Sequence, residues 1–209
     1  MYKLYYCAGA CSMPIHVMLN ELNVPFETQK IDLSSGEQKK PEFLKINSRG
    51  QIPVLQDGAT IIREGSAIIA YLAEKHPTKL YPQSGADHLA AREWMAFCNA
   101  TLHPAYSRVF FLKGLDIDAA AKEKALAVAY DRLQALWDDV EARLAAGNKY
   151  LAGAHLTIAD VMMTVMANWS LPNALKYGAN TQRVFGEVCA RPSFQKTNAA
   201  EGVGFKAAA

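Results

Sequence analysis

The hydrophobic pattern of this chain changes character once, near residue 80. Up to about residue 78, short strand-like and helix-like segments alternate, whereas from about residue 87 onward only long helical periodicities are convincing. Residues 77–85 between them are rich in proline, glycine and polar residues, as linkers between domains are. The sequence therefore predicts two domains, over residues 1–78 and 87–209, joined by a linker at 79–86.

The first domain has the pattern of a compact mixed sheet. The predicted elements are strand, helix, strand, short helix, two hairpin strands and a closing helix, over residues 3–6, 15–22, 26–31, 41–46, 54–56, 60–62 and 67–75. The pair Asp57-Gly58 suits the tight turn of the hairpin. The order βαβ, α, ββ, α predicts a thioredoxin-like α/β domain with one parallel crossover.

The second domain is predicted to be all-helical. Apolar residues recur at spacings of three and four over residues 91–102 and 126–144, which is typical of long bundle helices. Thr157 and Asp160 have the spacing of a capping box, so we assign Asp160 to a helix cap and not to catalysis. Arg191-Pro192 predicts a break before a final short helix.

Charge and composition exclude several classes of protein. The 209-residue chain has a formal net charge of +2 and no basic run longer than Lys39-Lys40, which disfavours a nucleic-acid partner. It has no apolar run near 18 residues and enters a strand pattern at once, so we expect neither a membrane span nor a signal peptide. The four cysteines lack metal-site spacing and fit free thiols in a reducing compartment, which predicts no metal and a cytoplasmic location.

Three short stretches in the first domain carry candidate site residues. A glycine-containing turn delivers Cys11 to the start of a predicted helix, whose N-terminus favours a thiolate. Pro53 stands directly before an apolar strand, which predicts a sheet edge or a cis turn. Glu64 precedes Gly65 and Ser66 at another helix start, where free N–H groups can hold a carboxylate. Together they predict a small acidic ligand against a sheet edge, with its reactive end near Cys11.

Each of these residues also has a purely structural interpretation. Cys11 could be a small buried side chain, Pro53 a turn former, and Glu64 a residue that favours the helix macrodipole. We favour a function for Cys11 because a turn precedes it, and for Glu64 because Gly65 leaves room for close approach.

The order of these features resembles the glutathione S-transferase family over essentially the whole chain. The resemblance rests on the thioredoxin-like domain followed by a helical one, with Cys11, Pro53, Glu64-Gly65 and the capping box at Thr157. It implies a glutathione transferase that conjugates the glutathione thiolate to small hydrophobic electrophiles in detoxification. Glutathione is then a co-substrate, no cofactor is bound permanently, and the protein is a homodimer.

Within the family, the stretch Gly9-Ala10-Cys11-Ser12 together with His103 is most similar to the bacterial beta class. The implied catalytic residues are Cys11 and His103. The implied glutathione-binding residues are Ala10, Ser12, Gln51, Ile52, Pro53, Glu64, Gly65 and Ser66. The implied walls of a hydrophobic substrate pocket are Tyr106, Phe110 and Trp169.

The resemblance also implies how glutathione lies. The main chain of Ile52 pairs with the cysteinyl backbone, as in strand addition, and Glu64 faces the γ-glutamyl ammonium. The N–H groups of Gly65 and Ser66 take the γ-glutamyl carboxylate. The helix N-terminus after Cys11, nearby N–H donors and a protonated His103 could each lower the pKa of the reacting thiol.

The chain departs from the beta-class pattern at three places. Ser34-Ser35-Gly36 occupies the stretch where relatives carry a lysine for the glycyl carboxylate, which leaves Lys39 or Lys40 as substitutes. Ala96 and Thr101 stand where relatives reach glutathione across the dimer. Pro104 follows His103 and could bend its helix.

Two other functions stay open at this level. Cys11 could itself form a mixed disulfide with glutathione, which would make the chain a thiol-disulfide oxidoreductase or peroxidase. Alternatively, the chain could keep the fold without catalysis and act as a binding or interaction module.

Overall fold

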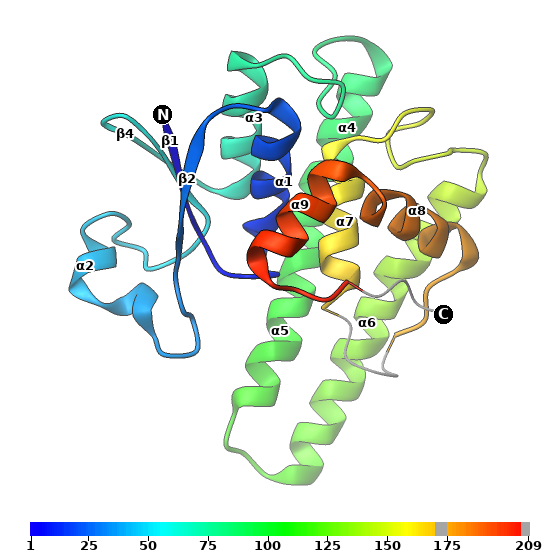
Figure 1. Cartoon of the computed structure of the whole chain (residues 1–209). Helices are drawn as coiled ribbons and strands as arrows, with labels where there is room; N and C mark the ends of the chain where they lie inside the picture. Colours follow the sequence, from blue (N-terminus) through cyan, green and yellow to red (C-terminus); the bar gives the residue numbers. More distant parts are fainter. Residues whose placement is uncertain (170–174, 206–209) are drawn as a thin grey trace. The chain divides into compact units, whose positions relative to one another are not determined.

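The structure is a computed structural model that describes residues 1–169 and 175–205. It divides into two compact units (Figure 1). Of the described residues, one unit contains Met1–Gln83 together with residues 188–205, and the other contains those within Ser84–Glu187.

The first unit is built on a four-stranded mixed sheet of order β2-β1-β3-β4. Its strands are β1 (Tyr2–Tyr6), β2 (Phe26–Lys30), β3 (Val54–Asp57) and β4 (Thr60–Arg63). Strand β1 pairs in parallel with β2 and antiparallel with β3, and β3 pairs antiparallel with β4. Its first three helices are α1 (Met13–Leu22), α2 (Pro41–Leu44) and α3 (Gly65–Lys75). The predicted thioredoxin-like order of elements is confirmed.

The sheet buries both faces because its central strands alternate toward different helices. On one face Tyr5 and Val54 pack with Phe43 of α2. On the other face Leu4 is fully buried, and the ring of Tyr6 contacts His16 of α1 at 5.6 Å. This alternation explains why β1 is apolar at successive positions, where a strand with one solvent face would alternate apolar and polar residues.

The last helix, α9 (Pro192–Glu201), belongs to this first unit. The sequence assigned it to the helical domain over residues 87–209, so the structure differs here. Helix α9 packs along α1 (Figure 1), where Asn20 donates to Thr197 at 2.8 Å and Arg191 pairs with Glu21. Contacts between residues about 170 positions apart cannot be read from local periodicity, which explains the difference.

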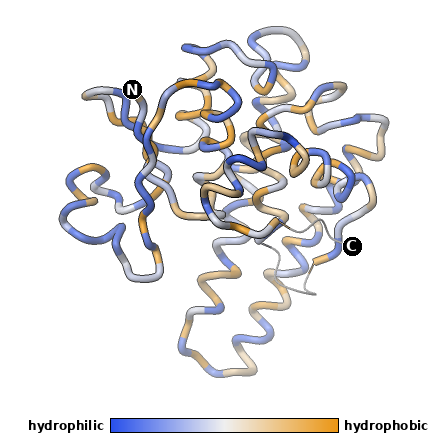
Figure 2. The backbone as a smooth tube through the Cα atoms, viewed as in Figure 1, coloured by the Kyte–Doolittle hydropathy of each residue, from blue (hydrophilic) through white to orange (hydrophobic). Residues whose placement is uncertain are grey.

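The second unit is helical among the residues that the structure describes. Its elements are α4 (Gly85–Phe97), a π-helical turn (Cys98–Leu102), α5 (His103–Gly114), α6 (Ala119–Ala145), α7 (Ile158–Ala167) and most of α8 (Ala179–Cys189). The predicted helical domain is confirmed. Pro104 does not end the helical run, because α4, the π-helical turn and α5 follow one another without a break, and the π-helical turn lies directly before this proline. Figure 2 shows hydrophobic and hydrophilic residues interspersed along α5 and α6. No helix in the described ranges is long and apolar enough to span a membrane.

The predicted capping box at the start of α7 is present. Asp160 accepts from the N–H of Thr157 at 2.8 Å and from its hydroxyl at 3.0 Å. It also accepts from the N–H of Leu151 at 2.9 Å, so one buried carboxylate fixes both the helix start and the loop before it.

Candidate active site

The turn before Cys11 is held by Ser12 and requires Gly9. Gly9 has φ +67°, and the side chain of Val203 lies 3.2 Å from the position that a Cβ on this glycine would take. The buried Ser12 hydroxyl donates to the carbonyl of Cys7 and accepts from its N–H, both at 3.1 Å. Ala10 donates its N–H to the same carbonyl, also at 3.1 Å. These bonds close the turn and fix Cys11 at the start of α1.

The Cys11 thiol lies against the main chain of Ile52. Its Sγ is 3.8 Å from the Ile52 carbonyl oxygen, to which it is a weak donor. Burial raises the pKa of Cys11 to about 11, although a backbone hydrogen bond opposes the rise. The expectation that the helix N-terminus favours a Cys11 thiolate is therefore wrong, because desolvation outweighs it.

The loop that leads to Ile52 is organised by a buried asparagine. Asn47 is 2% exposed and donates from Nδ2 to the carbonyl of Gln51 at 2.7 Å. The main-chain carbonyl of Asn47 accepts a hydrogen bond from the Gly50 N–H at 2.8 Å. The Ile52–Pro53 peptide bond is cis, one of the two alternatives that the sequence left for this proline. Ile52 packs its side chain on the apolar cluster around Tyr5, so its main chain lies at the edge of the site.

The start of α3 offers an anion site beside a carboxylate. Among the described residues, none accepts from the N–H groups of Gly65 and Ser66, as is usual in the first turn of a helix. Glu64 has φ 70°, a region that non-glycine residues rarely adopt, and such backbone strain is concentrated at functional sites. Its side chain, 58% exposed, pairs with Arg49 at 2.7 Å. Arg49 was not predicted, because it lies in a polar loop without a motif.

Lys39 lies over the same loop. Its Nζ is 3.4 Å from the carbonyl oxygen of Arg49. A Cβ on Gly50, whose φ is +60°, would lie 2.9 Å from this nitrogen and 2.7 Å from the carbonyl oxygen of Gln38. Lys40 lies elsewhere, lining a small pocket of about 140 Å³ with Glu37 and Glu42. Of the two lysines left open by the sequence, Lys39 is thus next to the candidate site.

A buried carboxylate from the end of the chain holds the Cys11 turn. Glu201 of α9 accepts from the Gly9 N–H at 2.8 Å and contacts Nδ1 of His16 at 2.8 Å. Both side chains are at most 4% exposed. This pair was not predicted from the sequence. In the sequence, only the position of His16 within the apolar stretch of α1 hints at a buried partner. The residues around Glu201 do not show that this glutamate is buried.

The predicted residues of the second unit form one aromatic cluster. The ring of His103 is 5.2 Å from that of Trp169, which in turn is 5.5 Å from Tyr106 and 6.3 Å from Phe110. Tyr106 is 1% exposed and accepts from Nε1 of Trp137 at 3.0 Å, so it is a core residue of this unit. Phe110 is 45% exposed and can contact a ligand.

Burial lowers the pKa of His103 below its ordinary value of 6.5. The imidazole is therefore neutral at pH 7, which differs from the expectation of a protonated His103. A neutral ring among aromatic side chains can donate one hydrogen bond and accept another, but it cannot stabilise a thiolate by charge.

The predicted residues thus fall into two groups. Cys11, Ile52 and the start of α3 belong to the first unit with all other predicted glutathione contacts, and His103 belongs to the second with the aromatic side chains. All four cysteines are free thiols. Within the described residues, no cluster of three or more histidine, cysteine or acidic side chains could hold a metal ion.

Family models match both units separately. Residues 8–75 match the glutathione S-transferase N-terminal domain, and residues 104–184 match its C-terminal domain. The chain belongs to the glutathione S-transferase family. Members with similar sequences come from plants and bacteria. Glutathione S-transferase 3 of Zea mays is 34% identical over 89% of this chain and 87% of its own. Glutathione S-transferase GstA of Escherichia coli O157:H7 is 27% identical over 96% and 99%.

Solved structures of the family superpose over nearly the full length. A glutathione S-transferase from Xylella fastidiosa gives a TM-score of 0.84 at 26% identity, covering 97% of this chain and 100% of that one. A sphingomonad glutathione S-transferase complexed with glutathione gives 0.83 at 26% identity with the same coverage. The thioredoxin-like fold and the helical domain are those of the family.

Proposed function

We propose that this transferase adds the glutathione thiolate to small hydrophobic electrophiles, and that glutathione binds along Ile52 with its thiol beside Cys11. The observation that carries the proposal is the 3.8 Å contact between Cys11 Sγ and the Ile52 carbonyl oxygen. A tripeptide whose cysteinyl main chain pairs with Ile52 would place its own sulfur next to this thiol.

The state of Cys11 supports conjugation over thiol exchange. An exchange enzyme needs its own cysteine as a thiolate, whereas a pKa of about 11 keeps Cys11 protonated at neutral pH. A protonated thiol can donate a hydrogen bond to the glutathione sulfur and stabilise its thiolate. In this scheme Cys11 is a donor, and glutathione is the nucleophile.

The γ-glutamyl end would lie at the start of α3. The free N–H groups of Gly65 and Ser66 suit its carboxylate, and the exposed Glu64 carboxylate suits its ammonium. The ion pair of Glu64 with Arg49 does not oppose this arrangement. Both side chains are more than half exposed, and such pairs contribute little to stability, so Glu64 can accept a second cation at small cost.

Lys39 would take the glycyl carboxylate in place of the missing lysine, because its ammonium lies over Gly50 at the edge of the site. Lys39→Met should raise the KM for glutathione, and Lys40→Met is the matched control. The Lys39→Met substitution should lower the affinity for the dipeptide γ-glutamylcysteine, which lacks glycine, much less than the affinity for glutathione. An equal loss for both ligands would show that Lys39 does not contact the glycyl carboxylate.

Calorimetric titration of the reduced protein with glutathione at neutral pH tests the proposal directly. Saturable binding at micromolar to millimolar affinity is expected, and Glu64→Ala should weaken it, since the ligand ammonium then loses its partner. If no heat of binding is measured at several millimolar glutathione, the site is not functional.

The beta class, a role in detoxification, a cytoplasmic location and a homodimer remain part of this proposal. The stretch Gly9-Ala10-Cys11-Ser12 supports the class, and the four free cysteines fit a reducing compartment. We also propose that Phe110 and Trp169 contact the hydrophobic electrophile and that His103 acts there in its neutral form. Substitution of Phe110 by Ser should then raise the KM for an activated aryl chloride and leave the KM for glutathione unchanged.

A further inference from the structure

Arg49 lies between the places proposed for the two ends of glutathione. Its main-chain carbonyl oxygen is 3.4 Å from Nζ of Lys39, the residue proposed for the glycyl carboxylate. Its guanidinium Nη1 is 2.7 Å from Oε1 of Glu64, the residue proposed for the γ-glutamyl ammonium. The binding described above gives the guanidinium itself no role.

The main chain of Arg49 is held by the buried Asn47. The N–H of Arg49 donates to Oδ1 of Asn47 at 3.2 Å, while Nδ2 of the same amide donates to the carbonyl of Gln51 at 2.7 Å. One side chain therefore braces both Arg49 and the residue directly before Ile52. The base of the arginine is thus placed relative to the proposed pairing strand before any ligand binds, which reduces the cost of ordering it.

The pair of Arg49 and Glu64 leaves hydrogen-bonding groups free on both side chains. Only Nη1 and Oε1 are engaged, so among the described residues Nε and Nη2 of Arg49 have no acceptor and Oε2 of Glu64 has no donor. The side chains are 60% and 58% exposed, so a ligand can reach these groups. A cation and an anion thus stand side by side, each with open bonding positions.

Such a pair matches the head group of an α-amino acid. The γ-glutamyl end of glutathione carries an ammonium and a carboxylate on one carbon atom, so its two charges are adjacent as well. The ammonium can take Oε2 of Glu64 while the carboxylate meets the fork of Arg49, and each ligand charge then lies beside its opposite. The N–H groups of Gly65 and Ser66, which directly follow Glu64, add donors for the same carboxylate.

The charges of the whole site also balance in kind. Lys39, Arg49 and Glu64 supply two cations and one anion, and glutathione with its thiol protonated supplies two carboxylates and one ammonium. Without Arg49, the second carboxylate would meet helix N–H groups beside an anionic side chain. With Arg49, every charged group of the ligand has a charged partner.

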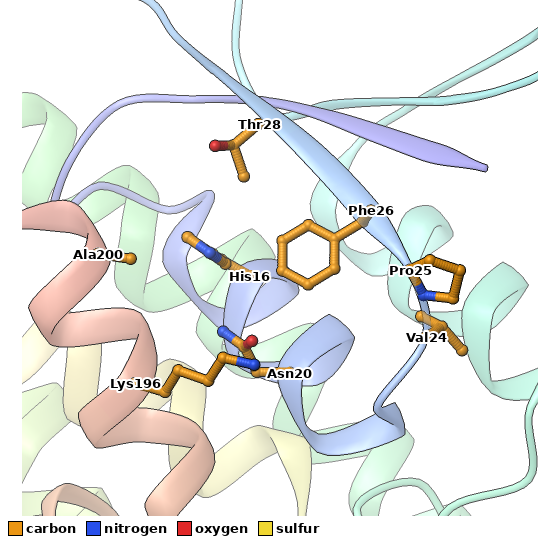
Figure 3. A pocket seen from close by; sticks show the side chains of 8 residues that line it. All are labelled: His16, Asn20, Val24, Pro25, Phe26, Thr28, Lys196 and Ala200. Carbon is orange, nitrogen blue, oxygen red and sulfur yellow. The ribbon is translucent and has the colours of Figure 1, made fainter.

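A pocket elsewhere in the same unit lacks this pairing. It lies between α1, the start of β2 and α9, has a volume of about 410 Å³, and includes Lys196 but no carboxylate in its lining (Figure 3). It offers an ammonium group no charged partner. An adjacent cation and anion are what distinguishes the surface at Arg49.

We propose that Arg49 binds the γ-glutamyl carboxylate of glutathione and so selects thiols that carry this group. The inference rests on the proposed function, because it needs glutathione along Ile52 with its γ-glutamyl end at α3. Arg49 contacts the ligand through Nε or Nη2 and keeps its bond to Glu64 through Nη1. It touches a part of glutathione that does not react, so its loss should raise the KM for glutathione and leave kcat unchanged.

Calorimetric titration with three thiols tests the role of Arg49. Glutathione is the reference, 4-aminobutanoyl-cysteinylglycine lacks the γ-glutamyl carboxylate, and glutaryl-cysteinylglycine lacks the ammonium. Arg49→Gln should weaken binding of glutathione and of the glutaryl analogue about fivefold, and should not weaken the 4-aminobutanoyl analogue. Glu64→Gln should give a different pattern, with loss of affinity for glutathione and the 4-aminobutanoyl analogue and none for the glutaryl analogue.

Two further variants serve as controls. Arg132→Gln removes the same charge from an exposed arginine of α6 that has no ion pair among the described residues, and it should leave binding of all three thiols unchanged. Arg49→Lys keeps the charge but not the planar fork, so it should weaken glutathione only about twofold. Both variants at Arg49 should keep the melting temperature of the wild-type protein, because the ion pair that they alter is exposed.

The pattern of losses separates this inference from the proposed function. An equal loss for all three thiols in Arg49→Gln would show that Arg49 acts only through the shape of its loop. Unchanged or tighter binding of glutathione in that variant would show that the guanidinium adds nothing or competes with the ligand for Glu64. Either result overturns the role of Arg49 while the wild-type protein still binds glutathione, whereas a wild-type protein that binds no glutathione would overturn both proposals.

Discussion

Two titratable residues of the candidate site have pKa values that local sequence would not suggest. Cys11 begins a helix, a position that lowers the pKa of a thiol, yet its pKa is about 11 because the folded chain surrounds it. His103 is shifted for the same reason, and burial removes its charge at neutral pH. In both cases desolvation outweighs local electrostatics, so neither residue carries charge into the reaction.

Alkylation should report the state of Cys11. The pKa of Cys11 is about 11, whereas a free thiol has an ordinary pKa of 9.0. The thiolate fraction of Cys11 at pH 7 is therefore about 100-fold lower than that of a free thiol. Reaction of Cys11 with iodoacetamide, followed by peptide mass spectrometry, should thus be slow at pH 7 and rise about tenfold per pH unit up to pH 10. Fast alkylation at pH 7 would show that Cys11 is a thiolate.

Replacement of Cys11 separates the two chemistries. Cys11→Ala removes a hydrogen-bond donor but not the nucleophile, so conjugation with an activated aryl chloride should persist at a rate reduced about tenfold. Reduction of a mixed disulfide of glutathione should be equally weak in the variant and in the wild-type protein. Exchange activity that is present in the wild-type protein and absent from the variant would identify an oxidoreductase instead.

His103 should make stability depend on pH. Its folded pKa lies below the unfolded value of about 6.5, so protonation favours the unfolded chain and stability is lost as pH falls below 6.5. The free energy of unfolding, measured in urea, should therefore fall from pH 7 to pH 5 less steeply in His103→Gln than in the wild-type protein. The exposed His155 provides the control, since His155→Gln should leave the slope unchanged.

At the scale of single elements, we expect the helix cap at Asp160 to stabilise the fold more than the cap at Asp118, because its carboxylate accepts hydrogen bonds from two segments of the chain. Asp160 holds both the start of α7 and the Leu151 N–H, whereas Asp118 caps α6 at the surface with one bond to Ala121 at 2.9 Å. Asp160→Ala should cost about 2–4 kcal/mol of unfolding free energy and Asp118→Ala about 1 kcal/mol, as measured by urea denaturation. Equal costs would mean that burial adds nothing to the cap.

Helix α9 links the end of the chain to the Cys11 turn. Glu201→Ala leaves the Gly9 N–H and His16 without their partner, so it should lower stability by about 2–3 kcal/mol and raise the KM for glutathione about threefold. Glu21→Ala is the matched control, because it breaks another contact between α1 and α9 that is partly exposed. It should cost less than about 1 kcal/mol and leave the KM unchanged. An unchanged KM in Glu201→Ala would show that the turn does not need this support.

At the scale of the whole molecule, the proposed homodimer sets the expected mass. Light scattering after gel filtration should give twice the 22.9 kDa of one chain. The mass should not change between 0.1 and 1 M salt if apolar contacts dominate the interface, since screening affects exposed charges only. A mass of one chain at micromolar protein would contradict the dimer.

Sequence patterns anticipated those features of the chain that depend on near neighbours. The order of strands and helices follows from hydrophobic periodicity, the α7 cap from the spacing of Thr157 and Asp160, and the helix start at residues 64–66 from the small residues that follow Glu64. Each of these depends on residues only a few positions apart, within reach of one turn or one hydrogen bond.

What lay beyond sequence analysis involves partners distant along the chain. The assignment of α9 to the first unit, the pairing of Glu201 with Gly9, and the contact of Lys39 with the Arg49 carbonyl became visible only once residues distant in sequence were placed together. The sequence by itself determined the family, the two domains and the thiol at the head of α1. Only the tertiary structure decided that this thiol stays protonated, because desolvation depends on the atoms that surround it and not on its neighbours in sequence.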